Sequence, residues 1–165
     1  HKIAMRHILF VCTANQCRSP MAAGLFNRQI AQLGEADRWH VASAGTWAED
    51  QRPATMLART TMAEQNVDIS GHRSRLLDGD LLRGVDVILV MTRHHQEAIR
   101  AEFPDVADRT FMISQLIGQT FDITDPVLGT LDDYRRCAAD LQQILRDGYT
   151  RLAELADRGA GNHSN

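Results

Sequence analysis

The chain has 165 residues, a length that suits one domain with a single hydrophobic core. Its composition, 44% hydrophobic and 24% charged, is that of an ordinary globular protein. The net charge of −3 provides no basic stripe for nucleic acid, and the longest apolar run, residues 87–91, is too short to span a membrane. We therefore expect neither nucleic acid nor a membrane as a partner.

The cysteine content argues for a reducing environment. Three cysteines, an odd number, do not suggest a disulfide framework. Their spacing lacks the paired Cys/His pattern of a zinc site, so we expect no metal and no cofactor. Free thiols are the rule in the cytoplasm, which is the predicted location.

The domain is expected to cover residues 5–158. Residues 1–4, which precede Met5, are expected to be a cloning remnant. The polar residues 159–165 are expected to form a mobile tail.

The first predicted unit is a strand, a loop and a helix. Residues 7–12 form an apolar run with strand-like composition that ends at Cys12. A polar loop follows, after which Ser19 as N-cap and Pro20 as first helical residue predict a helix. Loop amides and the positive end of the helix dipole converge in such a unit, which predicts an anion site.

Cys12 and Arg18 stand at the two ends of this loop. The five residues between them are enough to curl around one tetrahedral oxyanion, two of whose oxygens Arg18 can bind side by side. The same positive field favours the Cys12 thiolate, a nucleophile aimed at phosphorus. The spacing alone is weak evidence, and its place between strand and helix carries the argument. A buried structural Cys12 with Arg18 as a surface charge is the simpler alternative, which leaves the polar loop without a role.

The rest of the chain alternates helices with strands, which predicts a doubly wound parallel sheet of four strands with ligands at their carboxyl ends. The polar residues His94 and His95 are expected on an exposed helix face. By periodicity and composition, helices are predicted at 20–33, 53–66, 80–83, 93–103 and, as one long element, 131–155, and further strands at 41–45, 85–91 and 110–113.

Asp125 is the candidate acid and base. Pro126 pushes Asp125 into an extended conformation on the loop at 115–129. A carboxylic acid there could protonate a leaving oxygen and later deprotonate the water that hydrolyses a phosphocysteine. An Asp-Pro pair by itself is more often a turn.

A resemblance to a known family lies in residues 12–20, which read CTANQCRSP. They look like the phosphate-binding loop of the low-molecular-weight protein tyrosine phosphatases, and Asp125-Pro126 matches the late Asp-Pro pair of that family. The resemblance implies a three-layer α/β sandwich with a four-stranded parallel sheet in the flavodoxin-like order 2-1-3-4 and helices on both faces. It implies a cysteine-dependent phosphomonoesterase with Cys12 as nucleophile, Arg18 as phosphate ligand and Asp125 as acid and then base, without a metal.

The resemblance also implies supporting roles for further residues. Cys17 would protect the nucleophile through a reversible disulfide, although the residues leave open that it is a small apolar wall residue. The implied phosphate ligands are Thr13, Ala14, Asn15, Gln16, Cys17 and Arg18; the implied loop supports are Asn15, Ser19, Ser43 and His72; the implied substrate wall is Trp47, Gln16 and Val127.

The expected partner is a phosphorylated protein, with an oxyanion such as phosphate in the loop. Residues 91–95 and 125–135 look like the bacterial branch that includes protein-arginine phosphatases. Gln16 matches neither the threonine of that branch nor the aliphatic residue of tyrosine-specific members, and Val127 stands where aromatics are common. Phosphotyrosine is the favoured substrate and phosphoarginine the alternative.

A different enzyme class, thiol-coupled arsenate reductase, also begins with such a loop. It needs two further cysteines on a mobile segment in the middle of the chain. Between Cys17 and Cys137 this sequence has none, so this alternative is disfavoured.

Overall fold

A computed structural model describes residues 4–163. Within that range, four parallel strands form one sheet in the order β2-β1-β3-β4, which confirms the predicted order. Their bounds are Arg6–Cys12 for β1, Trp39–Gly45 for β2, Val87–Val90 for β3 and Thr110–Met112 for β4.

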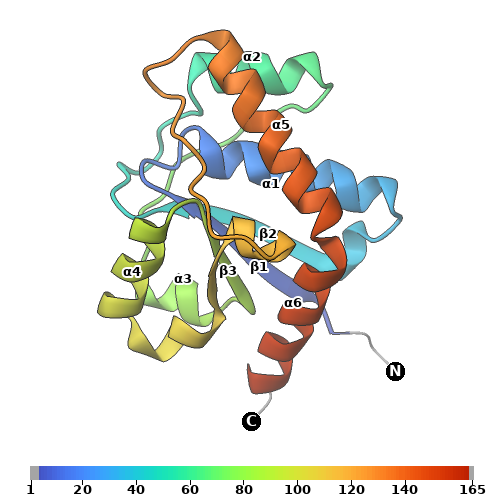
Figure 1. Cartoon of the computed structure of the whole chain (residues 1–165), viewed down its shortest axis with the longest axis vertical. Coiled ribbons are helices and arrows are strands. Elements are labelled where there is room, and N and C mark those ends of the chain that lie inside the picture. The colour runs from blue at the N-terminus through green and yellow to red at the C-terminus, as the bar shows by residue number, and fades with distance from the viewer. Residues whose placement is uncertain (1–3, 164–165) are drawn as a thin grey trace.

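Helices alternate with these strands along the chain (Figure 1). The α-helices are α1 (Arg18–Gln32), α2 (Met56–Glu64), α3 (Gly79–Arg83), α4 (Arg93–Glu102), α5 (Leu131–Asp147) and α6 (Tyr149–His163). Short 3-10 helices are η1 (Ala36–Arg38), η2 (Pro104–Arg109) and η3 (Ile113–Ile117).

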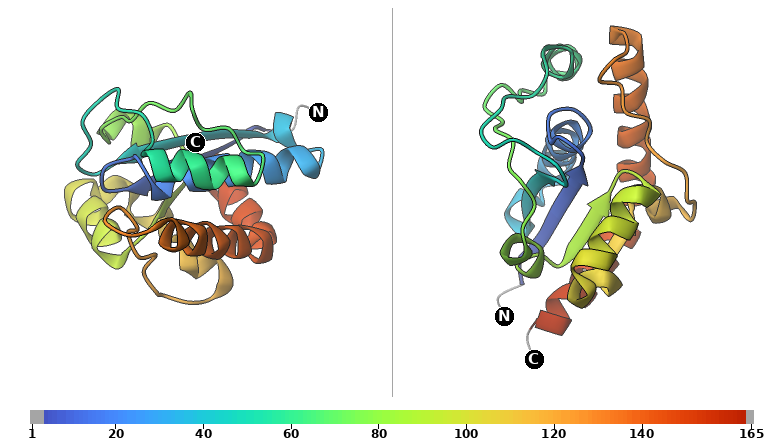
Figure 2. Two further views of the ribbon diagram at one scale, coloured as in Figure 1. Left: turned by 90° about the horizontal axis from the view of Figure 1, so that it is seen from above. Right: turned by 90° about the vertical axis from the view of Figure 1, so that its left-hand side faces the viewer.

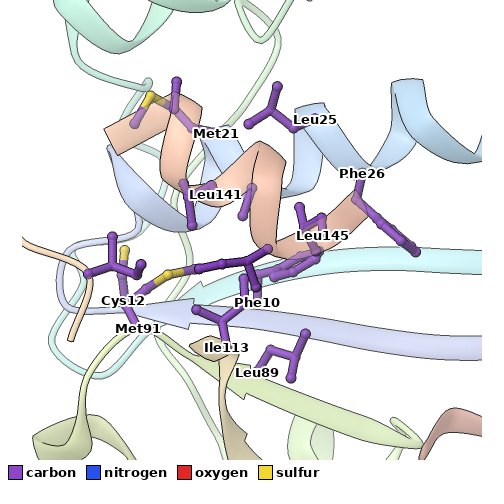
Figure 3. Packing of buried hydrophobic residues seen from close by; sticks show 14 of the residues in the cluster. Phe10, Cys12, Met21, Leu25, Phe26, Leu89, Met91, Ile113, Leu141 and Leu145 are labelled. Carbon is purple, nitrogen blue, oxygen red and sulfur yellow. The ribbon is translucent and has the colours of Figure 1, made fainter. Parts of the chain in front are cut away.

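The sheet is covered on both faces because its strands carry apolar side chains in both directions. On β1, Ile8 and Phe10 face a core shared with α1, α2, α5 and α6, whereas Leu9 and Val11 face a core shared with α3 and α4. In the right-hand view of Figure 2 the strands lie in the interior of the molecule, with helices around them. On the first face, Phe10 lies beneath side chains of α1 and α5, such as Leu141 (Figure 3). The predicted three-layer α/β sandwich is confirmed.

The strand order places a cleft region at the carboxyl end of β1. The chain passes from β1 to β2 on one side and returns to β3 on the other, so the order reverses at β1. Ligands bind at such switch points in open parallel sheets. Cys12 is the last residue of β1 and pairs with Gly45, the last residue of β2. The loop after Cys12 therefore lies where this fold binds ligands.

Two predicted helix starts differ from the structure. Helix α1 begins at Arg18 with Cys17 as its N-cap, so Ser19 is inside the first turn and is no cap. The Ser19 hydroxyl is engaged by neighbouring loop side chains instead of by a helix amide. Helix α2 begins at Met56, three residues after Pro53, because the Thr55 side chain accepts a hydrogen bond from the Ala58 amide and caps the helix there.

The predicted long terminal helix is two helices, α5 and α6, which meet at Gly148. A Cβ on Gly148 would lie 2.5 Å from the Leu116 Cβ, so the bend packs closely against η3. Helix α6 runs on to His163, so residues 159–163, which the sequence places in a polar tail, are helical. Gly159 lies against the backbone of Asp86, an approach that a side chain would block. Residues 1–3 and 164–165 lie outside the described residues.

None of the helices described between residues 4 and 163 has both the length and the apolar character that crossing a lipid bilayer requires.

Leu141 on α5 is part of the hydrophobic core, so truncating its side chain should reduce the stability of the protein. Leu141 is fully buried, so Leu141→Ala should lower the free energy of unfolding by about 2–5 kcal/mol through lost burial and a cavity. Leu128 is 98% exposed, and Leu128→Ala should change it by less than about 0.5 kcal/mol. Urea unfolding of both variants checks this, and equal costs would contradict the assigned layers.

Candidate active site

The loop after β1 has its shape from one residue in a left-handed conformation. Asn15 has a φ of 59°, which Asn tolerates better than most residues. Among the hydrogen bonds of residues 4–163, none has the amide of residue 14, 15, 16 or 17 as donor. These four amides at the start of α1 are therefore available to an anion, as the loop sequence predicts.

The buried side chain of Asn15 holds this conformation. Its Oδ1 accepts from the backbone amide of Arg75 at 3.0 Å, and this contact fixes which end of the side-chain amide is oxygen. Its Nδ2 therefore faces two hydroxyls, Ser19 Oγ at 2.8 Å and Ser43 Oγ at 3.0 Å. Asn15 thus connects the loop to β2 and to the segment that precedes α3.

Ser19 connects this network to the nucleophile candidate. Its Oγ lies 2.9 Å from Cys12 Sγ and already accepts from Asn15 Nδ2. The hydroxyl hydrogen of Ser19 is therefore free to be donated to the sulfur, and a donated hydrogen bond stabilises a thiolate.

His72 supports the same residue from outside the loop. Its Nε2 lies 2.7 Å from the carbonyl oxygen of Asn15, and since a carbonyl only accepts, Nε2 carries the hydrogen. Burial lowers the pKa of His72, which favours the neutral ring. The four predicted loop supports, Asn15, Ser19, Ser43 and His72, therefore lie in one connected network.

Arg18 and Asp125 meet across the loop although 107 positions separate them in the chain. The Arg18 guanidinium is buried, donates to the Ile123 carbonyl at 2.9 Å and lies 3.4 Å from Asp125 Oδ2. The Asp125 side chain is 42% exposed, and its Oδ1 accepts from the Val127 amide. Arg18 therefore connects the anion loop to the loop of the carboxylate.

A cavity of about 100 Å³ opens between these groups. Its walls combine most of the predicted site residues with one that the sequence did not indicate, Thr55. Trp47, predicted as a wall, is not among the lining residues; its side chain is 85% exposed, although its amide donates to the Thr13 carbonyl. The lining residues are Cys12, Thr13, Ala14, Gln16, Cys17, Arg18, Thr55, Asp125 and Val127.

Cys17 faces two hydroxyl groups, one on Thr55, the N-cap of α2, and one on Tyr134 in α5. Its Sγ lies 3.5 Å from the Tyr134 hydroxyl and 3.8 Å from Thr55 Oγ1, and these two oxygens are 3.0 Å apart. Burial raises the pKa of the Cys17 thiol and raises that of Tyr134 to about 12. Cys17 is thus a buried thiol against a polar wall, and its redox role stays a prediction.

His95 is buried, contrary to the exposed position that the polar residues around it suggested. Only 3% of its surface is exposed, because the first turn of α4 packs against the anion loop. Its Nε2 lies 2.9 Å from Thr13 Oγ1, whereas its Nδ1 is buried without a partner. Burial, with a smaller contribution from the Arg18 charge, lowers the pKa of His95 to about 4. Its neighbour His94 is exposed, as expected.

This arrangement can bind an oxyanion and attack it from one side. Amides and a guanidinium supply positive charge, a thiol lies at the base of the cavity, and a carboxylate lies at its rim. Within residues 4–163, no group of three or more His, Cys, Asp or Glu residues is placed to hold a metal ion.

Comparison with known proteins places this geometry in a family. Residues 7–157 match the model of the family described as low molecular weight phosphotyrosine protein phosphatase. A protein-arginine-phosphatase from Bacillus subtilis is 35% identical over 140 residues, which cover 84% of this chain and 91% of that protein. A probable low molecular weight protein-tyrosine-phosphatase, EpsP, from Ralstonia solanacearum is 36% identical over 92% of this chain and 99% of its own.

Solved structures agree with this match. The low molecular weight protein tyrosine phosphatase of T. tengcongensis has a TM-score of 0.84 and 34% identity, over 88% of this chain and 99% of that chain. The arginine phosphatase YwlE, solved as a mutant with a phosphorylated active site serine, has a TM-score of 0.84 and 32% identity, over 89% of this chain and 95% of that chain.

The Asn15 network predicts that the loop depends on one side chain. Asn15→Ala removes three hydrogen bonds and leaves a left-handed residue without its stabilising contacts. We expect the free energy of unfolding to fall by about 2–4 kcal/mol and phosphate affinity to weaken about tenfold or more. Urea unfolding and calorimetric titration with phosphate measure the two effects. Asn27→Ala, at an exposed position of α1, is the control. Unchanged phosphate affinity in Asn15→Ala would contradict the role of Asn15 in shaping the loop.

The burial of His95 predicts a pH dependence of stability. Between its ordinary pKa of 6.5 and the folded value of about 4, the unfolded chain binds a proton that the folded chain excludes. His95 therefore does not reduce the free energy of unfolding above about pH 6.5. It reduces this free energy progressively as the pH falls from 6.5 toward 4. From pH 7 to pH 5, wild type should lose about 2 kcal/mol more unfolding free energy than His95→Gln.

Urea unfolding at both pH values, with His94→Gln as the exposed control, measures this difference. A His95→Gln variant whose stability falls with pH as steeply as that of wild type would show that His95 is not the group responsible.

Proposed function

Since the chain belongs to the low molecular weight phosphotyrosine protein phosphatase family, we propose that it hydrolyses phosphorylated side chains of proteins through a phosphocysteine on Cys12. The family membership makes it a cysteine-based phosphatase. The roles of individual residues and the choice of substrate are our proposal. The observation that carries them is the cavity in which the Cys12 thiol, the free loop amides and the Arg18 guanidinium converge.

Cys12 is the nucleophile in this proposal. The sulfur attacks phosphorus, the S–P bond forms, and the bond from phosphorus to the substrate atom breaks. The amides of residues 14–17 and the Arg18 guanidinium bind the phosphoryl oxygens and stabilise the charge that builds up in the transition state. The Ser19 hydroxyl, 2.9 Å from the sulfur, supports the thiolate before attack and as it leaves.

Asp125 is the proton donor and acceptor. Its carboxyl protonates the leaving atom of the substrate in the first step. In the second step, the Asp125 carboxylate takes a proton from water, the oxygen attacks phosphorus, and the S–P bond breaks to release phosphate. Its place at the rim, 3.4 Å from Arg18 Nη2, supports this role because the leaving group must face the open side of the cavity.

Phosphotyrosine in a protein is the substrate that we propose first. The rim of the cavity has an apolar side at Val127, which is 47% exposed and can lie against a phenyl ring. Leu128, the next residue, is 98% exposed and can extend this contact to the polypeptide around the phosphorylated residue.

Phosphoarginine is the second candidate, and one contact favours it. The Gln16 side chain donates from Nε2 to the Pro53 carbonyl at 3.0 Å, so its Oε1 is left as an acceptor at the cavity wall. A phosphoarginine side chain carries N–H donors that this oxygen can bind, whereas a phosphotyrosine ring carries none. The similarity to a protein-arginine-phosphatase adds to this case.

We also propose the cytoplasm as the location. The mechanism needs Cys12 as a free thiolate, and all three cysteines are free in the structure. A reducing compartment preserves such thiols.

Turnover of two phosphopeptides, one with phosphotyrosine and one with phosphoarginine, tests the proposal. Wild type should hydrolyse at least one of them, and Cys12→Ser should abolish turnover because it removes the thiolate. Asp125→Asn should lower kcat about 10²- to 10⁴-fold, the contribution of a positioned acid and base. Phosphate release measures all three rates.

Asp108→Asn, an exposed carboxylate on η2, is the matched control and should retain wild-type rates. If wild type releases phosphate from neither peptide, the proposed substrates are wrong. If Cys12→Ser stays active, the proposed nucleophile is wrong. The ratio of the two wild-type rates decides between phosphotyrosine and phosphoarginine.

A further inference from the structure

The Thr13 hydroxyl lies between two side chains from distant parts of the chain. Its Oγ1 is 2.9 Å from His95 Nε2 on α4 and 3.5 Å from Arg18 Nη2 on α1. Thr13 directly follows Cys12 and lines the cavity in which the phosphoryl group is proposed to bind. The direction of the hydroxyl hydrogen therefore determines whether Thr13 can donate a hydrogen bond to a substrate in the cavity.

The surroundings of His95 determine which of its ring nitrogens carries the hydrogen. With a pKa lowered to about 4, the ring is neutral near pH 7 and has a single N–H. A hydrogen on Nδ1 would be a buried donor without a partner, since Nδ1 contacts no acceptor. Orphaned buried N–H groups are rare because they lose their hydrogen bonds to water and gain none. The hydrogen therefore resides on Nε2, which donates to Thr13 Oγ1.

The hydrogen bonds of Thr13 can then be counted. A hydroxyl has two acceptor lone pairs and one hydrogen. Arg18 Nη2 and His95 Nε2 both donate to Oγ1 and so occupy both lone pairs. Among residues 4–163 no acceptor is found for the remaining hydrogen, and the cavity lies beside it. The hydroxyl hydrogen is left to point into the cavity.

We propose that Thr13 binds a phosphoryl oxygen through its side-chain hydroxyl, and that His95 is a positioning residue that aims this hydroxyl by donating to it from Nε2. This inference rests on the proposed function, because it concerns the same phosphoryl site. It adds a side-chain donor to the ring of backbone amides and gives the buried imidazole of α4 a role in substrate binding.

A neutral imidazole suits this position next to Arg18. A cation at His95 would repel the guanidinium, whose charge contributes to the lowered pKa of the ring. The neutral ring directs the hydroxyl without adding charge.

The first test removes the hydroxyl and keeps the shape. Thr13→Val should lower kcat/KM about 10- to 100-fold, the value of one hydrogen bond to a charged group, and should weaken inhibition by inorganic phosphate by a similar factor. Thr13→Ser keeps the hydroxyl and should stay within about threefold of wild type. A Thr13→Val variant with wild-type phosphate inhibition would overturn the proposal.

The second test asks whether His95 acts through Thr13. His95→Leu should lower kcat/KM as Thr13→Val does, and the double variant should be no worse than Thr13→Val alone, because both remove the same hydrogen bond. His95→Gln, which offers an N–H donor near the position of Nε2, should recover part of the loss. His94→Leu on the exposed face is the matched control. Losses that multiply in the double variant would show that His95 acts independently of Thr13.

Nitrogen NMR of the wild-type imidazoles decides the orientation without any substitution. The proposal requires a protonated Nε2 and an unprotonated Nδ1 on His95 at pH 7, and the opposite tautomer would overturn it even if the variants fail to fold. Phosphate release by wild type and its loss in Cys12→Ser test the proposed function separately. If wild type is active and Thr13→Val is equally active, only the inference about Thr13 is rejected.

Discussion

The left-handed conformation of Asn15 is the constraint on which the site depends. It turns the chain so that the loop amides and Cys12 share one cavity, and it is held by hydrogen bonds to Ser19, to Ser43 on β2 and to the amide of Arg75. These partners belong to separate segments. The shape of the loop therefore depends on β2, which pairs with β1, and on the segment before α3, which pairs with the end of β2 at Gly45.

Arg18 is the second residue that connects separate segments of the site, because it contacts both Ile123 and Asp125. Its guanidinium is buried, yet its carboxylate partner, Asp125, is half exposed and 3.4 Å away. Burying a cation is unfavourable without close compensating charge. Asp125 supplies part of that charge, and an oxyanion bound in the cavity, as we propose, would add to it. Arg18 also connects the anion loop to the loop that carries Asp125, although 107 positions separate the two residues in the chain.

Where sequence patterns misled, tertiary contacts explain the difference. Ser19 resembles an N-cap, but its hydroxyl serves Cys12 and Asn15 because the loop curls back on α1. His95 stands among polar residues that suggest an exposed face, and the packing of α4 against the loop buries it. The apolar stripe from residue 131 to 155 continues across the bend at Gly148, because both helices pack on the same face of the sheet. The apolar periodicity indicates which face of a helix is buried, but it does not show that the helix ends and a second one begins at Gly148.

By itself, the sequence determined the local units and their chemistry: a strand ending in Cys12, a polar loop closed by Arg18, and strands alternating with helices, as in parallel sheets. These features depend on residues close together in the chain, where periodicity and capping preferences apply. Only the tertiary structure decided that Thr13 meets His95 and that Cys17 meets Tyr134, pairs that lie 82 and 117 positions apart in the chain. Such contacts are set by how the layers pack, and no local pattern specifies that packing.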